Sequence, residues 1–255
     1  MITTKRLFQI DSTEKPTSPY FQQNLDRVTK AHDFTTSSTH YLSDTMVERS
    51  REQLLVNLRI QGIYNLRVLE AIRAIPRERF IDEALASHAY ANHPLPIGHG
   101  QTISQPFIVA RMTEVLLNHA RMDTVLEIGS GCGYQTAVLA RLVNKVYSVE
   151  RIKRLYKSAG YNLQSLGLHN VQLKHGDGYE GWSEHAPYQG IMVTAAPETI
   201  PTNLLHQLAI GGCMIIPVGP HRGQQSLLKI IRTRTHYEQH TLEAVNFVPL
   251  KQGIS

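Results

Sequence analysis

A glycine-rich loop between two apolar segments is the first part of the sequence with residues suited to chemistry. It lies within VLEIGSGCGYQTAVLARL, residues 125–142, and its glycines are Gly129, Gly131 and Gly133. Glycine lets a backbone turn sharply and approach a ligand closely. Because the flanking segments are a predicted strand and a predicted helix, the loop is typical of a site for a nucleotide-like cofactor.

Two carboxylates follow at the ends of the next predicted strands. Glu150 ends VYSVE, about 20 residues after the first glycine, and from this position a carboxylate accepts hydrogen bonds from ribose hydroxyls. Asp177 lies in GDG after the following strand, where we expect it to meet an adenine amino group. The carboxyl ends of parallel strands meet at one edge of a sheet. Together with the loop, these positions therefore predict one cofactor site.

The spacing of the glycines favours one cofactor over another. A dinucleotide fingerprint has its third glycine at position 134, where this chain has Tyr134. NAD needs a helix N-terminus aimed at a pyrophosphate, whereas S-adenosyl-L-methionine carries no phosphate. The pattern E-x-G-x-G-x-G, which begins at Glu127, resembles the first motif of class I S-adenosylmethionine-dependent methyltransferases. Glu127 is expected to orient the loop or to face the cofactor's amino group through water.

Further segments carry a wider resemblance. They are LPIGHGQTISQP, VLEIGSGCGYQTAVLA, VYSVERI, LHNVQLKHGDGYEGW, IMVTAAPETIP and GGCMIIPVG, with AIPRERFIDEA and EAVNFVPL near the two ends. Over about residues 46–251 the chain resembles the protein-L-isoaspartate O-methyltransferase family, and TISQP and VTAAP are the discriminating pieces. The resemblance implies repair of aged proteins. The free α-carboxylate of an L-isoaspartyl residue, in a damaged protein or peptide, is methylated, and S-adenosyl-L-homocysteine is released.

The resemblance also implies which residues form the site. Ser104 in TISQP matches the active-site serine of the family, and its hydroxyl is expected to hold an oxygen of the substrate carboxylate. The same residue is predicted to be the N-cap of the next helix. The other expected substrate contacts are Thr102, Ile103, Gln105, Ala195 and Ala196. The expected cofactor contacts are Glu127, Gly129, Ser130, Gly131, Gly133, Tyr134, Gln135, Thr136, Glu150, Arg151, Asp177 and Gly178.

No general base is expected in such a reaction. A carboxylate with a pKa near 4 is ionised at pH 7, so the substrate is itself the nucleophile. This agrees with a chain in which no His–Asp or Cys–His pair stands out. The remaining task is to align oxygen, methyl and sulfur and to exclude water, and orientation can supply about 7–11 kcal/mol. Hydrogen bonds to the attacking oxygen are expected to be modest, because strong ones would hold it back.

The elements that would position these residues follow from the apolar pattern. From Asp123 onward strands alternate with helices, which predicts an α/β fold with a doubly wound, mostly parallel, Rossmann-like methyltransferase sheet. The last two β-rich segments, joined by the turn-like HYEQH, predict an antiparallel C-terminal hairpin. N-terminal helices are expected from Thr45 onward, and NHPLPIGHGQTISQP is expected to be a loop. Pro106 is predicted to lie early in the helix that follows.

Two domains are predicted, and the first is a flexible N-terminal extension over residues 1–45. That segment is rich in Ser, Thr, Gln and Asp, with few apolar residues in any period. Residues 46–255 are predicted to be a single methyltransferase domain. Within it, residues 46–122 are the expected helical substrate or cap region, and residues 123–255 the cofactor-binding sheet. Whether Met46 is the true start is left open.

Composition and charge restrict the expected partners. The chain has 255 residues and a formal net charge of +5, but no Lys/Arg-rich block alternates with aromatic residues, so nucleic acid is not expected. No apolar run approaches the roughly 18 residues of a membrane span, and no apolar stretch follows the basic residues at the start. We therefore expect a cytoplasmic enzyme without a membrane partner. No metal site is expected, because the cysteines and histidines lack metal-ligand spacing.

Three alternatives stay open from the sequence. A methyltransferase acting on RNA or a small molecule is consistent with the basic charge and would label RNA rather than an isoaspartyl peptide. A binding module would keep the cofactor pocket without turnover, and the retained TISQP argues against it. A nicotinamide-dependent oxidoreductase is the least favoured, because of Tyr134.

Overall fold

The computed structural model describes residues 45–255. The predicted extension over residues 1–45 lies outside them, except for its last residue. The chain separates into two units, Met1–Glu48 and Arg49–Ser255, and the fold given below is that of the second unit. Within the described residues, every helix is too short or too polar to cross a lipid bilayer.

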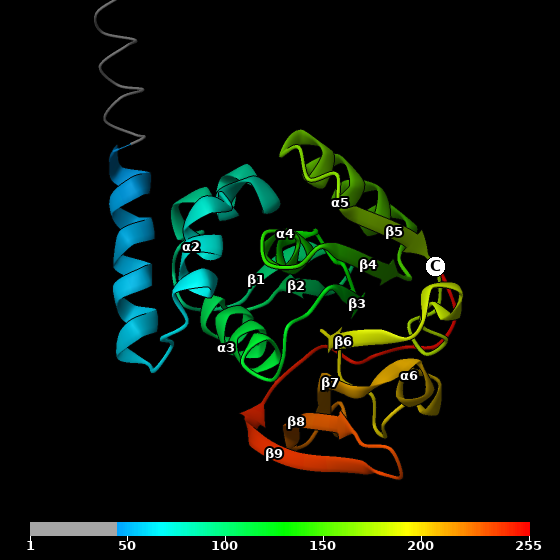
Figure 1. Ribbon diagram of the computed structural model, residues 1–255. Coiled ribbons are helices and arrows are strands. Elements are labelled where there is room, and N and C mark those ends of the chain that lie inside the picture. The colour runs from blue at the N-terminus through cyan, green and yellow to red at the C-terminus, as the bar shows by residue number, and fades with distance from the viewer. Residues whose placement is uncertain (1–44) are drawn as a thin grey trace, which may run out of the picture. The chain divides into compact units, whose positions relative to one another are not determined.

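A seven-stranded sheet is the centre of the second unit (Figure 1). Its strands are β3 (Thr124–Ile128), β4 (Lys145–Glu150), β5 (Val171–His175), β6 (Tyr188–Val193), β7 (Leu208–Val218), β8 (Gln225–Arg232) and β9 (Tyr237–Val245). They lie in the order β5-β4-β3-β6-β7-β8-β9, parallel from β5 to β7 and antiparallel from β7 to β9. The predicted mostly parallel sheet with an antiparallel C-terminal hairpin is confirmed, and the order of the far-edge strands is now known.

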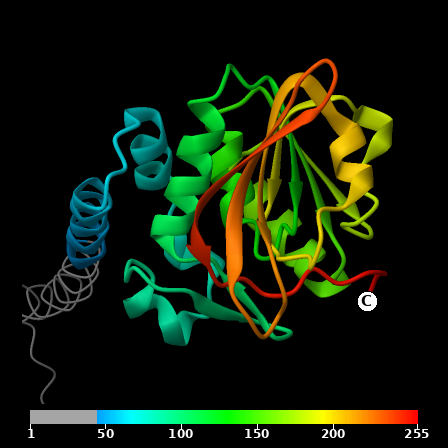
Figure 2. The same ribbon diagram turned by 90° about the horizontal axis from the view of Figure 1, so that it is seen from below.

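Helices cover both faces of this sheet. The α-helices are α2 (Leu66–Ala74), α3 (Pro106–Leu117), α4 (Tyr134–Ala140), α5 (Lys153–Ser165) and α6 (Thr202–Gln207), and a further helix occupies residues 45–60. The 3-10 helices are η1 (Arg77–Phe80), η2 (Glu83–His88) and η3 (Ser183–His185). Both views place α3 and α4 on one face of the sheet and α6 on the other (Figures 1 and 2). The doubly wound arrangement expected from the alternation of strands and helices is thereby confirmed.

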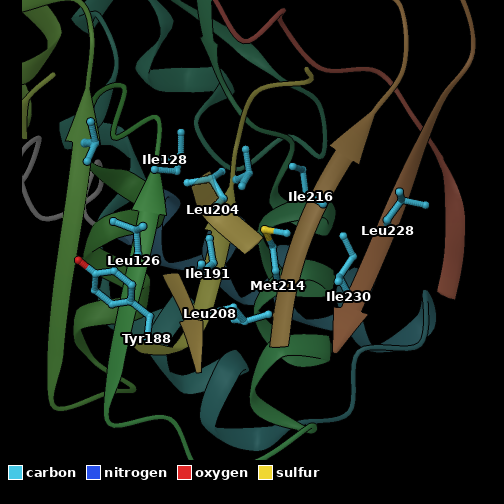
Figure 3. Close-up of a cluster of buried hydrophobic side chains, with 12 residues drawn as sticks. Leu126, Ile128, Tyr188, Ile191, Leu204, Leu208, Met214, Ile216, Leu228 and Ile230 are labelled. Carbon is cyan, nitrogen blue, oxygen red and sulfur yellow. The ribbon is translucent and has the colours of Figure 1, made fainter. Parts of the chain in front are cut away.

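The core between the sheet and α6 follows from the two-residue period of the strands. Alternate side chains of each strand point to one face, so every second apolar residue meets its counterpart on the next strand (Figure 3). This cluster consists of Leu126, Ile128, Val149, Tyr188, Ile191, Val193, Leu204, Leu208, Met214, Ile216, Leu228 and Ile230. The intervening residue Glu127 therefore points to the opposite face, beneath α4.

The chain order reverses at β3, which lies between β4 and β6. In open α/β sheets, ligands bind beyond the carboxyl ends of the strands at such a point. The glycine loop follows β3, Glu150 ends β4, and Thr194 directly follows β6. The topology therefore brings these residues to one edge of the sheet.

The segment NHPLPIGHGQTISQP is not the loop that its proline and glycine content predicted. It contains an antiparallel hairpin of β1 (Leu95–Gly98) and β2 (Gln101–Ile103). At the tip, Gly98, His99 and Gly100 have φ values of 83°, 54° and 67°. The glycines form the tight turn that connects two short strands, whereas their presence had suggested a long loop without strands.

The turn of the C-terminal hairpin also differs from the prediction. HYEQH was expected to be the turn, but β9 already begins at Tyr237 and the turn spans residues 233–236. The hydroxyl of Thr233 accepts hydrogen bonds from the backbone N–H groups of Thr235 (3.3 Å) and His236 (3.0 Å). A threonine side chain that binds nearby backbone in this way stabilises a turn, and it fixes the turn upstream of the expected residues.

Candidate active site

The glycine loop has a backbone conformation that favours glycine. Gly129, Gly131 and Gly133 have φ values of 96°, 55° and 93°. A Cβ on Gly129 would clash with Oγ1 of Thr194, and one on Gly131 would lie 3.3 Å from Cδ1 of Ile97. The loop therefore presents bare backbone at the edge of the sheet, as a closely bound cofactor requires.

Glu150 is fixed by hydrogen bonds from the backbone beside the glycine loop. Its Oε2 accepts from the N–H of Gly131 and its Oε1 from the N–H of Ile152, both at 2.8 Å. Each carboxylate oxygen can accept a further hydrogen bond. The carboxylate is thus held in place and still able to receive ribose hydroxyls.

Glu127 is fully buried beneath α4. Its Oε2 accepts hydrogen bonds from the hydroxyls of Thr136 and Ser148, both at 2.5 Å, while Oε1 has no partner among the described residues. Burial raises the pKa of Glu127 to about 7, and the two hydroxyls offset part of that rise. The hydroxyl of Ser130 lies 2.6 Å from that of Ser148, so a hydrogen-bonded chain joins this carboxylate to the glycine loop.

The first residues of α4 hold the loop from inside the protein. Tyr134 is 2% exposed, with the ring of Phe80 at 5.4 Å and the guanidinium carbon of Arg77 at 4.8 Å from its ring centre. Gln135 is also buried and donates to Oγ1 of Thr113 in α3, at 3.0 Å. These contacts fix the start of α4 against neighbouring elements.

Three adjoining cavities open at this edge of the sheet. The cofactor pocket is lined by Ile97, Gln101, Thr102, Ile128, Gly129, Gly131, Val149, Glu150, Arg151, Ile152, Leu155, Gly178, Thr194, Ala195, Val248, Pro249, Leu250 and Lys251. The substrate groove is lined by Pro94, Thr102, Ser104, Gln105, Ile108, Thr194, His221, Ala244, Val245, Asn246, Phe247 and Val248. The bridging cavity is lined by Thr102, Ile103, Ser104, Val109, Gly129, Ser130, Gly131, Cys132, Tyr134, Gln135 and Thr194. Thr102 and Thr194 line all three, so they mark where the cavities meet.

Ser104 lines the groove and the bridging cavity, and its hydroxyl makes no hydrogen bond within the described part of the chain. The prediction that Ser104 is an N-cap is wrong, since Gln105 is the N-cap of α3 and makes no side-chain capping bond. Instead, Oδ1 of Asn92 accepts from the N–H of Phe107 at 2.9 Å. Because a distant residue satisfies this helix end, the Ser104 hydroxyl is left free.

The other expected substrate residues lie in different places. Thr102 and Gln105 line the substrate groove, and Ile103 is buried in the wall of the bridging cavity. Ala195 lines the cofactor pocket, while Ala196 is buried and pairs through its backbone with the C-terminal segment. Of the five, Thr102 and Gln105 thus line the groove, and Ile103 lines the bridging cavity next to it.

The C-terminal segment, residues 248–255, crosses the edge of the sheet and forms one wall of the cofactor pocket. The backbone of Ala196 donates to Val248 and accepts from Leu250, both at 2.8 Å. Arg151 donates through Nε to the carbonyl of Gly253 at 3.0 Å. The two backbone bonds of Ser255, to Arg151 at 2.8 Å and Lys153 at 2.7 Å, fix the far end.

Asp177 is engaged by this segment rather than exposed in the pocket. Its Oδ2 accepts from the N–H of Gly253 at 2.5 Å, and its Oδ1 from the N–H of Tyr179 at 2.9 Å. Gly178 is among the residues that line the cofactor pocket, and Asp177 is not. The expected contact of Asp177 with adenine therefore stays a prediction.

Sequence reasoning missed Thr194 and the C-terminal segment. The hydroxyl of Thr194 donates to the carbonyls of Ile128 (2.9 Å) and Gly129 (2.7 Å), so it fixes the start of the glycine loop. The signals were in the motifs VTAAP, of which only Ala195 and Ala196 were selected, and EAVNFVPL, of which no residue was. The contacts themselves join residues far apart in the chain, and no local pattern reveals them.

The cysteine in the glycine loop is inert rather than reactive. Burial raises the pKa of Cys132 to about 11, although the backbone N–H of Tyr134 and the charge of Arg77 act in the opposite direction. A thiol with such a pKa is almost entirely protonated at neutral pH. Among the described residues, no three His, Cys, Asp or Glu side chains gather in a way suited to a metal ion.

Comparisons with known proteins agree on one family. Its model, described as protein-L-isoaspartate(D-aspartate) O-methyltransferase, matches residues 49–255. Proteins named protein-L-isoaspartate O-methyltransferase from Halorhodospira halophila and Pseudomonas paraeruginosa are each 55% identical over 206 residues, 81% of this chain and 93% and 97% of theirs. A solved structure of that name has a TM-score of 0.73 and 29% identity, covering 80% of this chain and 67% of its own. A Plasmodium falciparum structure titled a putative member, in complex with S-adenosyl-L-homocysteine, has a TM-score of 0.69 and 27% identity, covering 79% and 98%.

Proposed function

Since this chain belongs to the protein-L-isoaspartate(D-aspartate) O-methyltransferase family, we propose that it methylates the free α-carboxylate of L-isoaspartyl residues in damaged proteins and peptides. The chain is an S-adenosylmethionine-dependent methyltransferase, and its substrates are proteins. S-adenosyl-L-homocysteine and the methyl ester are the products. The ester then closes to a succinimide without further help and reopens in part to normal aspartate.

The observation that carries this proposal is the free hydroxyl of Ser104 between the substrate groove and the glycine loop. Thr102 and Thr194 line the substrate groove, the bridging cavity and the cofactor pocket, so the three spaces adjoin at these residues. A methyl transfer needs a route of this kind from cofactor to substrate. Ser104 lies beside that route, and its hydroxyl is available to donate a hydrogen bond to the substrate.

The residues at the cofactor end suit S-adenosylmethionine, which supplies an electrophilic methyl group when bound. The three glycines of the loop have positive φ angles, and a Cβ at any of them would press on a neighbouring residue, so the loop is bare backbone. Glu150 is held so that its carboxylate can accept ribose hydroxyls. Glu127 is joined through its Oε2 and the Ser148 hydroxyl to Ser130, and its Oε1, which has no partner among the described residues, suits a cationic amino group.

The substrate groove suits a carboxylate nucleophile. None of the described residues that line it is a lysine, arginine, aspartate or glutamate. A fixed cation there would stabilise the carboxylate before reaction more than in the transition state, where its charge is being neutralised, and would slow the transfer. The neutral hydroxyl of Ser104 can orient one oxygen without that penalty, and the ionised carboxylate needs no general base.

We propose that residues 46–122 contribute the substrate side of the domain and residues 123–255 the cofactor side; the groove takes residues from both. A cytoplasmic location and a lack of nucleic-acid partners remain proposals that cell fractionation and an RNA-labelling control would test.

One assay tests the function directly. The protein is given S-adenosylmethionine with a tritiated methyl group and either an isoaspartyl peptide or its aspartyl twin. Base-labile label on the isoaspartyl peptide alone is the expected result. Label on added RNA instead, or equal label on both peptides, would contradict the proposal.

A further inference from the structure

Arg77 is a fully buried arginine without a carboxylate partner. It begins η1 and is 0% exposed. None of the ion pairs among the described residues involves it, and its Nη1 has no hydrogen-bond partner there. Burying an unpaired cation costs more free energy than filling the same space with an apolar side chain. Stability alone therefore does not account for this residue.

The contacts of Arg77 join three segments that are far apart in the chain. Its Nε donates to the carbonyl of Ala89 at 2.9 Å, and its Nη2 donates to the carbonyl of Ser104 at 2.8 Å. The guanidinium also lies over the ring of Tyr134, the first residue of α4 after the glycine loop. One planar group thus touches the cap region, the serine and the start of the cofactor helix.

The bond to the Ser104 carbonyl matters because it restrains the backbone from which the serine side chain extends. The Ser104 hydroxyl has no hydrogen bond within the described chain, so the backbone of Ser104 determines where the hydroxyl can point. We propose that Arg77 is a positioning residue. It donates a hydrogen bond to the backbone of Ser104 and stacks on Tyr134 beside the glycine loop, so it holds the serine at a set distance from that loop. This inference rests on the proposed role of Ser104 in methyl transfer.

Two other roles make different predictions. If Arg77 attracted the substrate carboxylate by its charge, its loss would raise the KM for the peptide, and Arg77→Lys would be close to wild type. If Arg77 only held the fold together, its effect on kcat would be independent of Ser104. A positioning role instead predicts a fall in kcat that depends on Ser104 and that lysine does not restore, because an ammonium cannot bond two carbonyls and stack at once.

The experiment is a double-mutant cycle between Arg77→Met and Ser104→Ala. Alone, Arg77→Met is expected to lower kcat by about 100-fold, the loss that a displacement near 1 Å can cause, and to leave the affinity for S-adenosyl-L-homocysteine within about threefold. Added to Ser104→Ala, it is expected to cost less than about fivefold more. Arg77→Lys is the second variant. It keeps the positive charge and the aliphatic stem, so it can be measured if the methionine variant does not fold.

Arg232→Met is the matched control. Arg232 also donates to two backbone carbonyls, those of His206 and Leu208, and lies over a tyrosine ring, but it is at the opposite edge of the sheet. Its kcat should stay within about twofold of wild type. A loss of about 100-fold from Arg77→Met in the Ser104→Ala background would overturn the inference. Inactive wild-type protein would instead mean that the proposed function is wrong, so the two failures are distinguishable.

Discussion

The hydroxyl of Ser104 is free because the side chain of Asn92, and not that of Ser104, caps the start of α3. Asn92 bonds the N–H of Phe107, so the end of α3 does not need the serine. Ser104 itself could be found from the TISQP motif. Its capping role was predicted wrongly, because a local rule places the cap next to the helix, whereas this chain brings a side chain from 15 residues upstream. The chemistry of this residue was readable from sequence, and its hydrogen bonding was not.

Replacing Ser104 by alanine is expected to lower kcat by about 100-fold, because the substrate carboxylate loses its orienting donor. The melting temperature should not fall, since the hydroxyl makes no hydrogen bond within the described protein. Calorimetric affinity for S-adenosyl-L-homocysteine should stay at the wild-type value. Ser165→Ala, which removes a surface hydroxyl on α5, is the control. Unchanged turnover on an isoaspartyl peptide would remove Ser104 from the mechanism.

Glu127 is expected to make stability depend on pH. Its pKa rises from 4.5 to about 7 on burial, so the folded protein keeps a proton that the unfolded chain loses. This contribution to the free energy of unfolding is fully present below about pH 4.5 and is lost as the pH rises through about 7, and it is on the order of 3 kcal/mol.

The test is Glu127→Gln, which keeps a hydrogen-bonding side chain that does not ionise. Its free energy of unfolding in urea should fall less than that of the wild type between about pH 5 and pH 8. The same pH dependence in both proteins would show that Glu127 does not titrate in this range.

Elements were predicted well where they are long and poorly where they are short. The parallel strands and the helices between them were expected from their apolar periods. The strands β1 and β2 have four and three residues, too few for alternation to show, and their glycines and prolines suggested a loop. The turn before β9 was misplaced because a single threonine hydroxyl decides where it lies.

Asn92→Ala is predicted to weaken α3 as an element. The variant leaves the N–H of Phe107 without its acceptor, at a cost of about 1 kcal/mol in the free energy of unfolding. Because α3 begins directly after Ser104, a several-fold lower kcat should accompany the loss. Asn92→Asp keeps an acceptor and adds a negative charge near a helix N-terminus, so it should restore both values. Equal stability of the alanine and aspartate variants in thermal melts would argue against the capping role.

At the scale of the whole molecule, the site depends on contacts between distant parts of the chain. The alternation of strands and helices predicted a mostly parallel sheet with the cofactor at the carboxyl ends of its strands, whereas the reversal of strand order at β3 comes from the structure. The closing of that edge by residues 248–255 was not implied. Its contacts join residues up to 104 positions apart, as from Arg151 to Ser255, and short-range patterns carry no information about them.

Asp177→Asn is expected to loosen the C-terminal segment. Asparagine can still accept from Tyr179, but its amide nitrogen cannot accept from the N–H of Gly253. We expect about tenfold weaker binding of S-adenosyl-L-homocysteine, with faster amide hydrogen exchange over residues 248–255. Weaker binding with unchanged exchange would instead favour the direct contact of Asp177 with adenine.

The docking of residues 248–255 also sets an order in time. A ribosome makes β3, the glycine loop and β6 well before it makes this segment, so the strands at the centre of the sheet are synthesised before the pocket wall. Ala196, Arg151 and Asp177 can form their hydrogen bonds to the segment only after it has been synthesised. The pocket wall formed by Val248, Pro249, Leu250 and Lys251 is therefore added after the glycine loop and Glu150 have been made.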